Sequence, residues 1–140
     1  MKMIETIEVE SETLSSEEYF QQRLIREREQ TEKSGSHFML VLLDVGEVFN
    51  KQWGDKADLL QKMCSALNAS TREIDLKGWY LKNTLIGIIF PDIYKSDKSV
   101  VIDKIRQEIN SFLEPLEAAA VKIYTIFYSN MEETPPVIQN

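Results

Sequence analysis

Arg72 and Asp75, three positions apart, form an Arg-x-x-Asp pattern directly in front of a predicted β-hairpin. The guanidinium group of arginine is a planar fork of N–H donors, which pairs bidentately with phosphate or with the edge of a nucleobase. A nearby carboxylate accepts hydrogen bonds from N–H groups. The alternative is a simple ion pair in front of a strand, which contributes little stability if it is exposed. Residue types and spacing alone leave both interpretations of Arg72 and Asp75 open.

A further acid, Asp44, follows the continuous apolar run at residues 38–43. A run of this kind predicts a central, buried strand, and active sites often lie at the ends of such strands. Other chemistry has little support, because the chain has no Gly-rich phosphate loop and no evident nucleophile–base pair. Its single histidine, His37, is expected in a loop, and its single cysteine, Cys64, is expected in the core.

The segment after Arg72 predicts a β-hairpin, with strands at residues 74–80 and 85–90 and a tight turn between them. The tip of this hairpin, LKNTL, carries neither an acid nor a glycine. Trp79 and Tyr80 stand beside the tip and are candidate interface anchors. Strands also favour aromatic residues for packing alone, in which case one ring is buried and the other half exposed. Lys77 and Lys82 flank the hairpin and are expected on a solvated face.

The remaining elements frame the hairpin. Ser15-x-x-Glu18 is a capping box, and it predicts a helix at residues 16–33 with a narrow apolar face. A short helix or turn at 45–53, a helix opened by Gly54-Asp55, a helix at 98–113 and a strand at 121–128 follow. We expect an α+β fold with a ferredoxin-like βαββαβ sheet, helices packed on that sheet and an extra N-terminal helix. The helix at 98–113 is expected to end before Pro115 and to face inward through Val101, Ile102, Ile105, Ile109 and Phe112.

Composition limits the function further. The chain has 140 residues and a net charge of −7, which predicts one domain and argues against a nucleic-acid surface. One cysteine allows no internal disulfide, and no apolar run is long enough to cross a membrane, so a cytoplasmic protein without membrane insertion is expected. Residues 1–14 are expected to form a flexible acidic arm, residues 15–130 the domain and residues 131–140 a tail.

The order of elements and two local patterns resemble the GGDEF domain, the diguanylate cyclase family of the nucleotide-cyclase-like fold. Asp44 stands where the family's first strand ends in a metal-binding aspartate, and Arg72 and Asp75 match its inhibitory-site Arg-x-x-Asp. Five residues then separate Asp75 from the family's signature pentapeptide. This register puts the following residues where Gly-Gly-Asp-Glu-Phe would stand: Leu81, Lys82, Asn83, Thr84 and Leu85.

Departures from the family pattern argue against catalysis. The resemblance implies that two metal ions and GTP would need several carboxylates, yet Gly46, Asn83 and Thr84 replace acids, which leaves Asp44 as a vestigial metal ligand. Leu81 and Lys82 replace the glycines that let the backbone approach phosphates. Gln52 and Trp53 stand near the family's guanine-reading Asn-Asp. We therefore expect no enzyme activity and no cofactor.

Two functions remain open. The resemblance implies a sensor that binds cyclic di-GMP, or another nucleotide such as GTP, through Arg72 and Asp75, as in degenerate members that control exopolysaccharide synthesis. A second arginine is expected in such a site, and Arg23, Arg26 and Arg28 are the candidates. The alternative is a ligand-free interaction module that binds a second copy or a partner protein through the helix at 16–33 and the exposed edge of the sheet.

Overall fold

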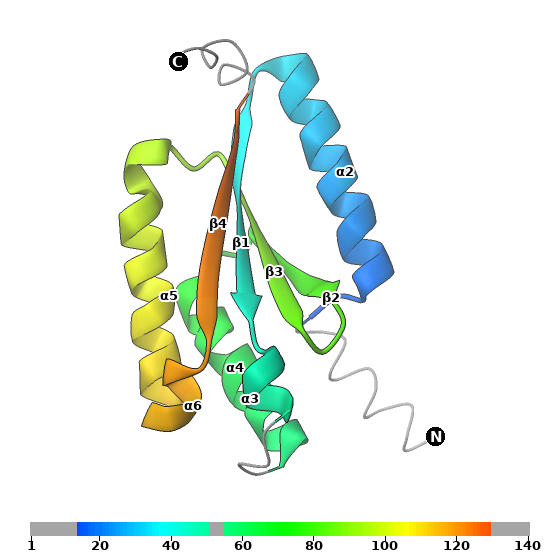
Figure 1. The fold of residues 1–140 in the computed structure, drawn as a ribbon. Helices are drawn as coiled ribbons and strands as arrows, with labels where there is room; N and C mark the ends of the chain where they lie inside the picture. Colours follow the sequence, from blue (N-terminus) through cyan, green and yellow to red (C-terminus); the bar gives the residue numbers. More distant parts are fainter. Residues whose placement is uncertain (1–13, 51–54, 130–140) are drawn as a thin grey trace, which may run out of the picture.

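The computed structural model describes residues 14–50 and 55–129 of the chain. Figure 1 shows a sheet flanked by helices. The elements are, in chain order, α2 (Glu17–Ser34), β1 (His37–Asp44), α3 (Gly46–Asn50), α4 (Lys56–Ser70), β2 (Leu76–Leu81), β3 (Leu85–Pro91), η1 (Lys95–Asp97), α5 (Lys98–Phe112), α6 (Pro115–Ala119) and β4 (Lys122–Ser129).

The sheet has four strands in the order β2-β3-β1-β4, and each pair of neighbours is antiparallel. The strand β1 lies inside the sheet, where Asp44 is the partner of Leu85 on β3 and of Lys122 on β4. The helical crossovers between β1 and β2 and between β3 and β4 complete the βαββαβ arrangement. The predicted α+β, ferredoxin-like fold with an additional leading helix is confirmed.

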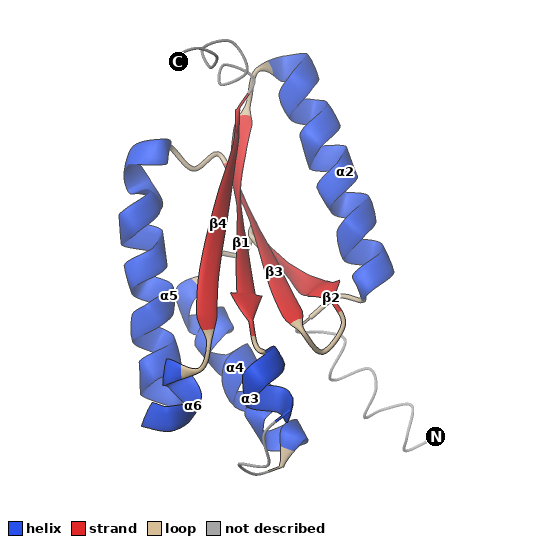
Figure 2. Ribbon diagram, viewed as in Figure 1, coloured by secondary structure: helices blue, strands red, loops and turns tan. Residues whose placement is uncertain are grey.

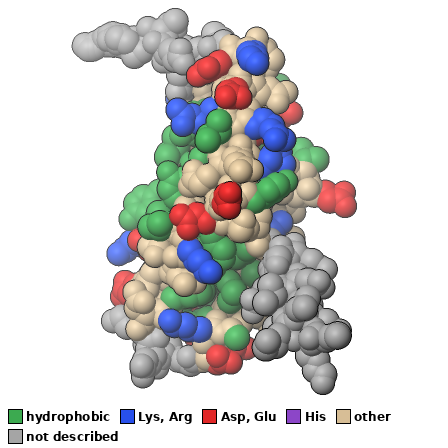
Figure 3. Space-filling view, turned by 90° about the vertical axis from the view of Figure 1, so that its right-hand side faces the viewer, with side chains coloured by type: hydrophobic (Ala, Val, Ile, Leu, Met, Phe, Trp, Pro, Cys, Tyr) green, Lys and Arg blue, Asp and Glu red, His purple; other side chains and the backbone are tan. Residues whose placement is uncertain are grey.

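Helices cover both faces of this sheet, with α2 on one face and α4 and α5 on the other (Figure 2). The predicted capping box at Ser15 is wrong by one residue, because the cap of α2 is Ser16, whose side chain accepts a hydrogen bond from the backbone N–H of Tyr19 at 3.2 Å, whereas Ser15 pairs with Gly78 on β2. The helix ends at Gly35, whose φ of 77° lies in the left-handed region that glycine adopts without strain. Phe20 and Leu24 bury its inner face, and charged side chains of both signs cover the outer face seen in Figure 3.

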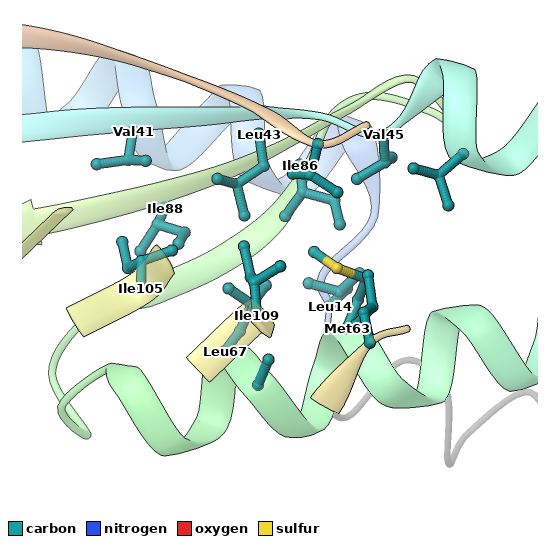
Figure 4. Close-up of a cluster of buried hydrophobic side chains, with 14 of the residues drawn as sticks. Leu14, Val41, Leu43, Val45, Met63, Leu67, Ile86, Ile88, Ile105 and Ile109 are labelled. Carbon is teal, nitrogen blue, oxygen red and sulfur yellow. The ribbon is translucent and has the colours of Figure 1, made fainter. Parts of the chain in front are cut away.

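Alternation along β1 creates two hydrophobic clusters, one on each face of the sheet. Phe38 and Leu40 pack with α2, whereas the residue that follows each of them, Met39 and Val41, packs with α4 and α5. The larger cluster is drawn in Figure 4, where side chains of β1 and β3 meet Met63 and Leu67 of α4 and Ile105 and Ile109 of α5. The sheet thus holds the hairpin and the end of β1 rigidly between two apolar layers.

Several sequence predictions need correction. His37 lies in β1 and not in a loop, with its ring between those of Tyr94 and Phe127. Phe112 does not face inward, since it is 40% exposed in the last turn of α5. Pro115 does more than follow α5, because it opens α6, a position that suits proline since the first helical N–H has no helical partner.

The expected boundary of the N-terminal arm also shifts. Leu14 is buried in the larger cluster, so it belongs with the folded domain and not with the arm. The rest of the arm at residues 1–13 and the tail at 131–140 lie outside the described residues. Cys64 is half-buried and packs against the same cluster. Among the described residues, no helix is both long enough and apolar enough to cross a membrane.

Candidate functional site

The Arg-x-x-Asp motif forms a closed turn between α4 and β2. The backbone N–H of Asp75 donates to the carbonyl of Arg72 at 3.1 Å. In return, the Asp75 carboxylate accepts from the backbone N–H of Arg72 at 2.6 Å, from Nε at 3.2 Å and from Nη2 at 2.7 Å. Asp75 therefore closes this turn through the backbone and the side chain of Arg72 together.

The two side chains of the motif differ in exposure. The Asp75 side chain is fully buried, whereas the Arg72 side chain is 47% exposed. The Arg72 guanidinium also donates to the carbonyl of Pro91 at 3.0 Å, which ties it to the end of β3. Its hydrogen bonds with the carboxylate of Asp75 raise the pKa of Arg72. In this conformation Asp75 orients Arg72, and only the arginine presents atoms to solvent.

Lys77 is a second cation near the turn between α4 and β2, a location that its sequence position alone did not predict. Its Nζ lies 3.3 Å from the hydroxyl oxygen of Thr71, the residue before Arg72. Thr71 caps the C-terminus of α4, so both cations lie where α4 turns into β2. An exposed guanidinium and an ammonium group at one junction are suited to binding a phosphate group.

The arginines on α2 have other neighbours. Arg23 lies beside Tyr19 and Glu27 on its own helix, at 3.4 and 3.5 Å. The Arg28 guanidinium lies 5.7 Å from the ring centroid of Tyr128 on β4. Since β4 and β2 are opposite edges of the sheet, Arg28 is not placed beside the Arg-x-x-Asp turn of its own chain.

The tip of the hairpin lies beside the end of β1, where Asp44 is located. The backbone N–H of Val45 donates to the carbonyl of Thr84 at 2.9 Å. A Cβ built on Gly46 would lie 3.3 Å from Asp44 Oδ1 and 3.5 Å from Thr84 Cγ2. Positions 44, 46 and 84 therefore converge at one point, and Asp44 supplies the single carboxylate among them.

The carboxylate of Asp44 is hydrogen-bonded to the backbone two residues further along the chain. Its Oδ1 accepts a hydrogen bond from the backbone N–H of Gly46 at 3.0 Å. Among the described residues, no group of three or more His, Cys, Asp or Glu side chains could hold a metal ion. Gln52 and Trp53, the residues expected near a guanine-reading position, lie outside the described residues.

The tip of the hairpin is hydrogen-bonded to side chains of α2. Glu17 Oε1 accepts from the backbone N–H of Lys82 at 3.3 Å, and Gln21 Nε2 donates to the carbonyl of Tyr80 at 3.1 Å. Trp79, a candidate interface anchor, is instead buried and packs edge-to-face on Phe49, whereas Tyr80 is half-buried. Side chains of the leading helix thus hold the tip of the hairpin by hydrogen bonds to its backbone.

The sequence and the fold were compared with known protein families and solved structures. The family model described as "Diguanylate cyclase, GGDEF domain" matches residues 13–132. The chain matches none of the curated proteins.

Among solved structures, the GGDEF domain of DgcB from Caulobacter crescentus, in complex with c-di-GMP, aligns with a TM-score of 0.63 and 19% identity, over 85% of this chain and 78% of that one. The diguanylate cyclase SiaD from Pseudomonas aeruginosa, in complex with its activator SiaC, aligns with a TM-score of 0.62 and 20% identity, over 90% of this chain and 54% of that one. PelD 156–455 from Pseudomonas aeruginosa PA14, in complex with c-di-GMP, aligns with a TM-score of 0.54 and 15% identity, over 81% of this chain and 40% of that one. At these identities the likeness shows a common fold.

Proposed function

The chain belongs to the GGDEF domain family, and we propose that it is a catalytically inactive, regulatory member that binds cyclic di-GMP through Arg72. The observation that carries this proposal is the contrast between its two sites. The position of the signature pentapeptide has lost its acids and glycines. The Arg-x-x-Asp turn, in contrast, holds a half-exposed arginine in a fixed orientation.

Loss of catalysis follows from the chemistry of phosphoryl transfer, which relies on metal ions for positioning and charge stabilisation. Asp44, Gly46 and Thr84 converge, but together they offer one carboxylate. The larger side chains of Leu81 and Lys82 stand where the family has glycine. Incubation with GTP and Mg²⁺ or Mn²⁺ is therefore expected to yield no cyclic di-GMP.

Ligand binding is assigned to the junction of α4 and β2. Arg72 and Lys77 would contact the phosphates or a guanine edge, while Asp75 would hold Arg72 in place. Support comes from DgcB and PelD, two proteins of the same fold that are described in complex with c-di-GMP. By the family resemblance, the regulated process would be exopolysaccharide synthesis.

The test is isothermal titration of the purified protein with cyclic di-GMP, and with GTP plus Mg²⁺ as a second ligand. Arg72→Lys is the decisive variant, because it keeps the charge and removes the fork of donors. Lys104→Ala is the matched control, since Lys104 is 49% exposed on α5 and pairs with Glu108. Thermal melts of all variants establish that they are folded.

Binding that is lost in Arg72→Lys and kept in Lys104→Ala would support the proposal. Binding that survives both Arg72→Lys and Arg72→Ala would overturn the assigned site. No binding by the wild type would overturn the sensor proposal altogether.

A second candidate function, a ligand-free interaction module, is favoured by one observation. The carboxylate of Asp75 is buried and already accepts hydrogen bonds from Arg72, so the motif also satisfies itself without a ligand. The absence of titration heat with either nucleotide, together with a folded protein, would favour this second function.

A further inference from the structure

The two edges of the sheet are built differently. At the β2 edge, Ser15 pairs alongside the strand: its N–H donates to the carbonyl of Lys77, and its carbonyl accepts from the N–H of Trp79, both at 3.1 Å. The pairing of β2 also shifts register between Trp79 and Leu81. Short pairings and bulges of this kind protect an edge strand from pairing with another chain.

The β4 edge has no comparable protection within the described residues. The strand pairs with β1 in an unbroken register over residues 122–129. It contains no proline, and Lys122, at its beginning, is its one charged residue. Within the part of the chain that the structure describes, β1 is the single strand that pairs with β4. No other strand of the described residues pairs with the outer edge of β4 along residues 122–128.

Apolar side chains accompany this open edge. Tyr124 is 50% exposed and Ile126 is 41% exposed. Their partners across the ladder are Leu42 and Leu40, so they lie on the face of the sheet that α2 covers. The helix α2 reaches β4 at Tyr128, whose ring lies under the guanidinium of Arg28, and it leaves Tyr124 and Ile126 exposed. Figure 3 shows hydrophobic side chains gathered beside the charged surface of α2.

We propose that β4 pairs antiparallel with β4 of a second copy of this chain, with Thr125 at the twofold axis. In this register Lys122 is opposite Tyr128, Ile123 is opposite Phe127 and Tyr124 is opposite Ile126. The strand is self-complementary here, because both exposed apolar residues meet each other and no two charges meet.

A second copy fits this edge for physical reasons. Strand addition provides a row of main-chain hydrogen bonds, and the exposed apolar side chains leave water at the same time. The single charge lies at one end of the strand, so a twofold pair keeps the two lysines apart. The pairing joins two sheets into one and does not involve Arg72, so it is independent of ligand binding.

The test uses the full chain and sedimentation velocity over a range of protein concentrations. The variant Tyr124→Lys/Ile126→Lys places lysines opposite each other in both symmetric positions, and Tyr124→Lys/Ile126→Glu places a lysine opposite a glutamate. We expect the first variant to raise the dimer dissociation constant by about tenfold or more and the second to retain the dimer. Leu116→Lys, at a 73% exposed position on α6, is the control.

A wild type that stays monomeric at every accessible concentration would overturn the proposal. So would a dimer that persists unchanged in the double-lysine variant, because that dimer would use another surface. Thermal melts of both variants show whether each is folded. Mixing the double-lysine variant with Tyr124→Glu/Ile126→Glu is expected to restore a heterodimer, and failure to do so would contradict the register.

Discussion

Gly78 and Gly87 are partners across the β2–β3 ladder, and the ring of Phe20 lies over both. A Cβ on Gly87 would lie 2.6 Å from Cζ of Phe20 and 2.7 Å from its Cε2, and one on Gly78 would lie 2.8 Å from its Cδ1. Because Gly78 and Gly87 have no side chains, they leave the space that the ring of Phe20, the largest side chain that α2 buries, occupies against the sheet. The leading helix is held on the sheet by this contact and by Leu24.

Gly87→Ala is therefore expected to destabilise the fold. The added methyl group must displace a ring that is fully buried, at a cost of about 1–3 kcal/mol in the free energy of unfolding. Urea denaturation measures this loss. Phe20→Leu makes room for the methyl group, so the double variant should lose less than the sum of the single losses. Additive losses would show that the ring does not limit the space at Gly87.

Asp75→Ala is expected to lower the free energy of unfolding by about 2 kcal/mol, because it removes a buried acceptor from hydrogen bonds with the backbone and the side chain of Arg72. Glu73→Ala is the matched control, since Glu73 is exposed in the same turn and should change stability by less than about 0.5 kcal/mol. Equal effects of the two changes, compared by thermal melts, would contradict a structural role for Asp75.

This pair shows what sequence can and cannot predict. The spacing of Arg72 and Asp75 identified the motif, and hydrophobic periodicity located the hairpin and α5 close to their observed ends. Spacing carries no information on burial, however. Whether Asp75 faces a ligand or the interior depends on how α4 meets the end of β3, which is a tertiary contact. The contact between Lys77 and Thr71 could not be predicted for the same reason.

Helix α6 was not predicted from the sequence, because the helix is short and one of its two stabilising contacts, with Lys62, is distant in sequence. The sequence predicts that Pro115 only ends α5, whereas in the structure Glu117 stabilises a new helical turn. Its Oε1 accepts a hydrogen bond from the backbone N–H of Glu114 at 2.9 Å and lies 3.8 Å from Nζ of Lys62 on α4. A periodicity window of 11–18 residues cannot resolve a helix of five.

Glu117→Ala is accordingly expected to cost about 1–2 kcal/mol, because a buried carboxylate that caps a helix N-terminus is lost. Glu117→Gln keeps an acceptor oxygen of the same reach and should lose less. Chemical denaturation of both variants, compared with Leu116→Ala on the exposed side of α6, tests this prediction. A loss in Leu116→Ala as large as that in Glu117→Ala would contradict it.

The last prediction concerns the convergence of Asp44, Gly46 and Thr84. If the backbone still has the shape of a cation site and has lost only the ligands, then Gly46→Asp/Thr84→Glu should complete a group of three carboxylates. We expect Mg²⁺ or Mn²⁺ to raise the melting temperature of this variant, because the cation binds only the folded state. The wild type and the isosteric Gly46→Asn/Thr84→Gln variant should show no such rise.

We expect no cyclase activity in the Gly46→Asp/Thr84→Glu variant, because Leu81 and Lys82 still stand where the family has glycines. A metal-dependent rise in the wild type that disappears in Asp44→Asn would contradict the prediction and would show that Asp44 holds a cation without further acids. A Gly46→Asp/Thr84→Glu variant that binds no metal would instead show that the backbone at the end of β1, and not only its side chains, has departed from a cation site.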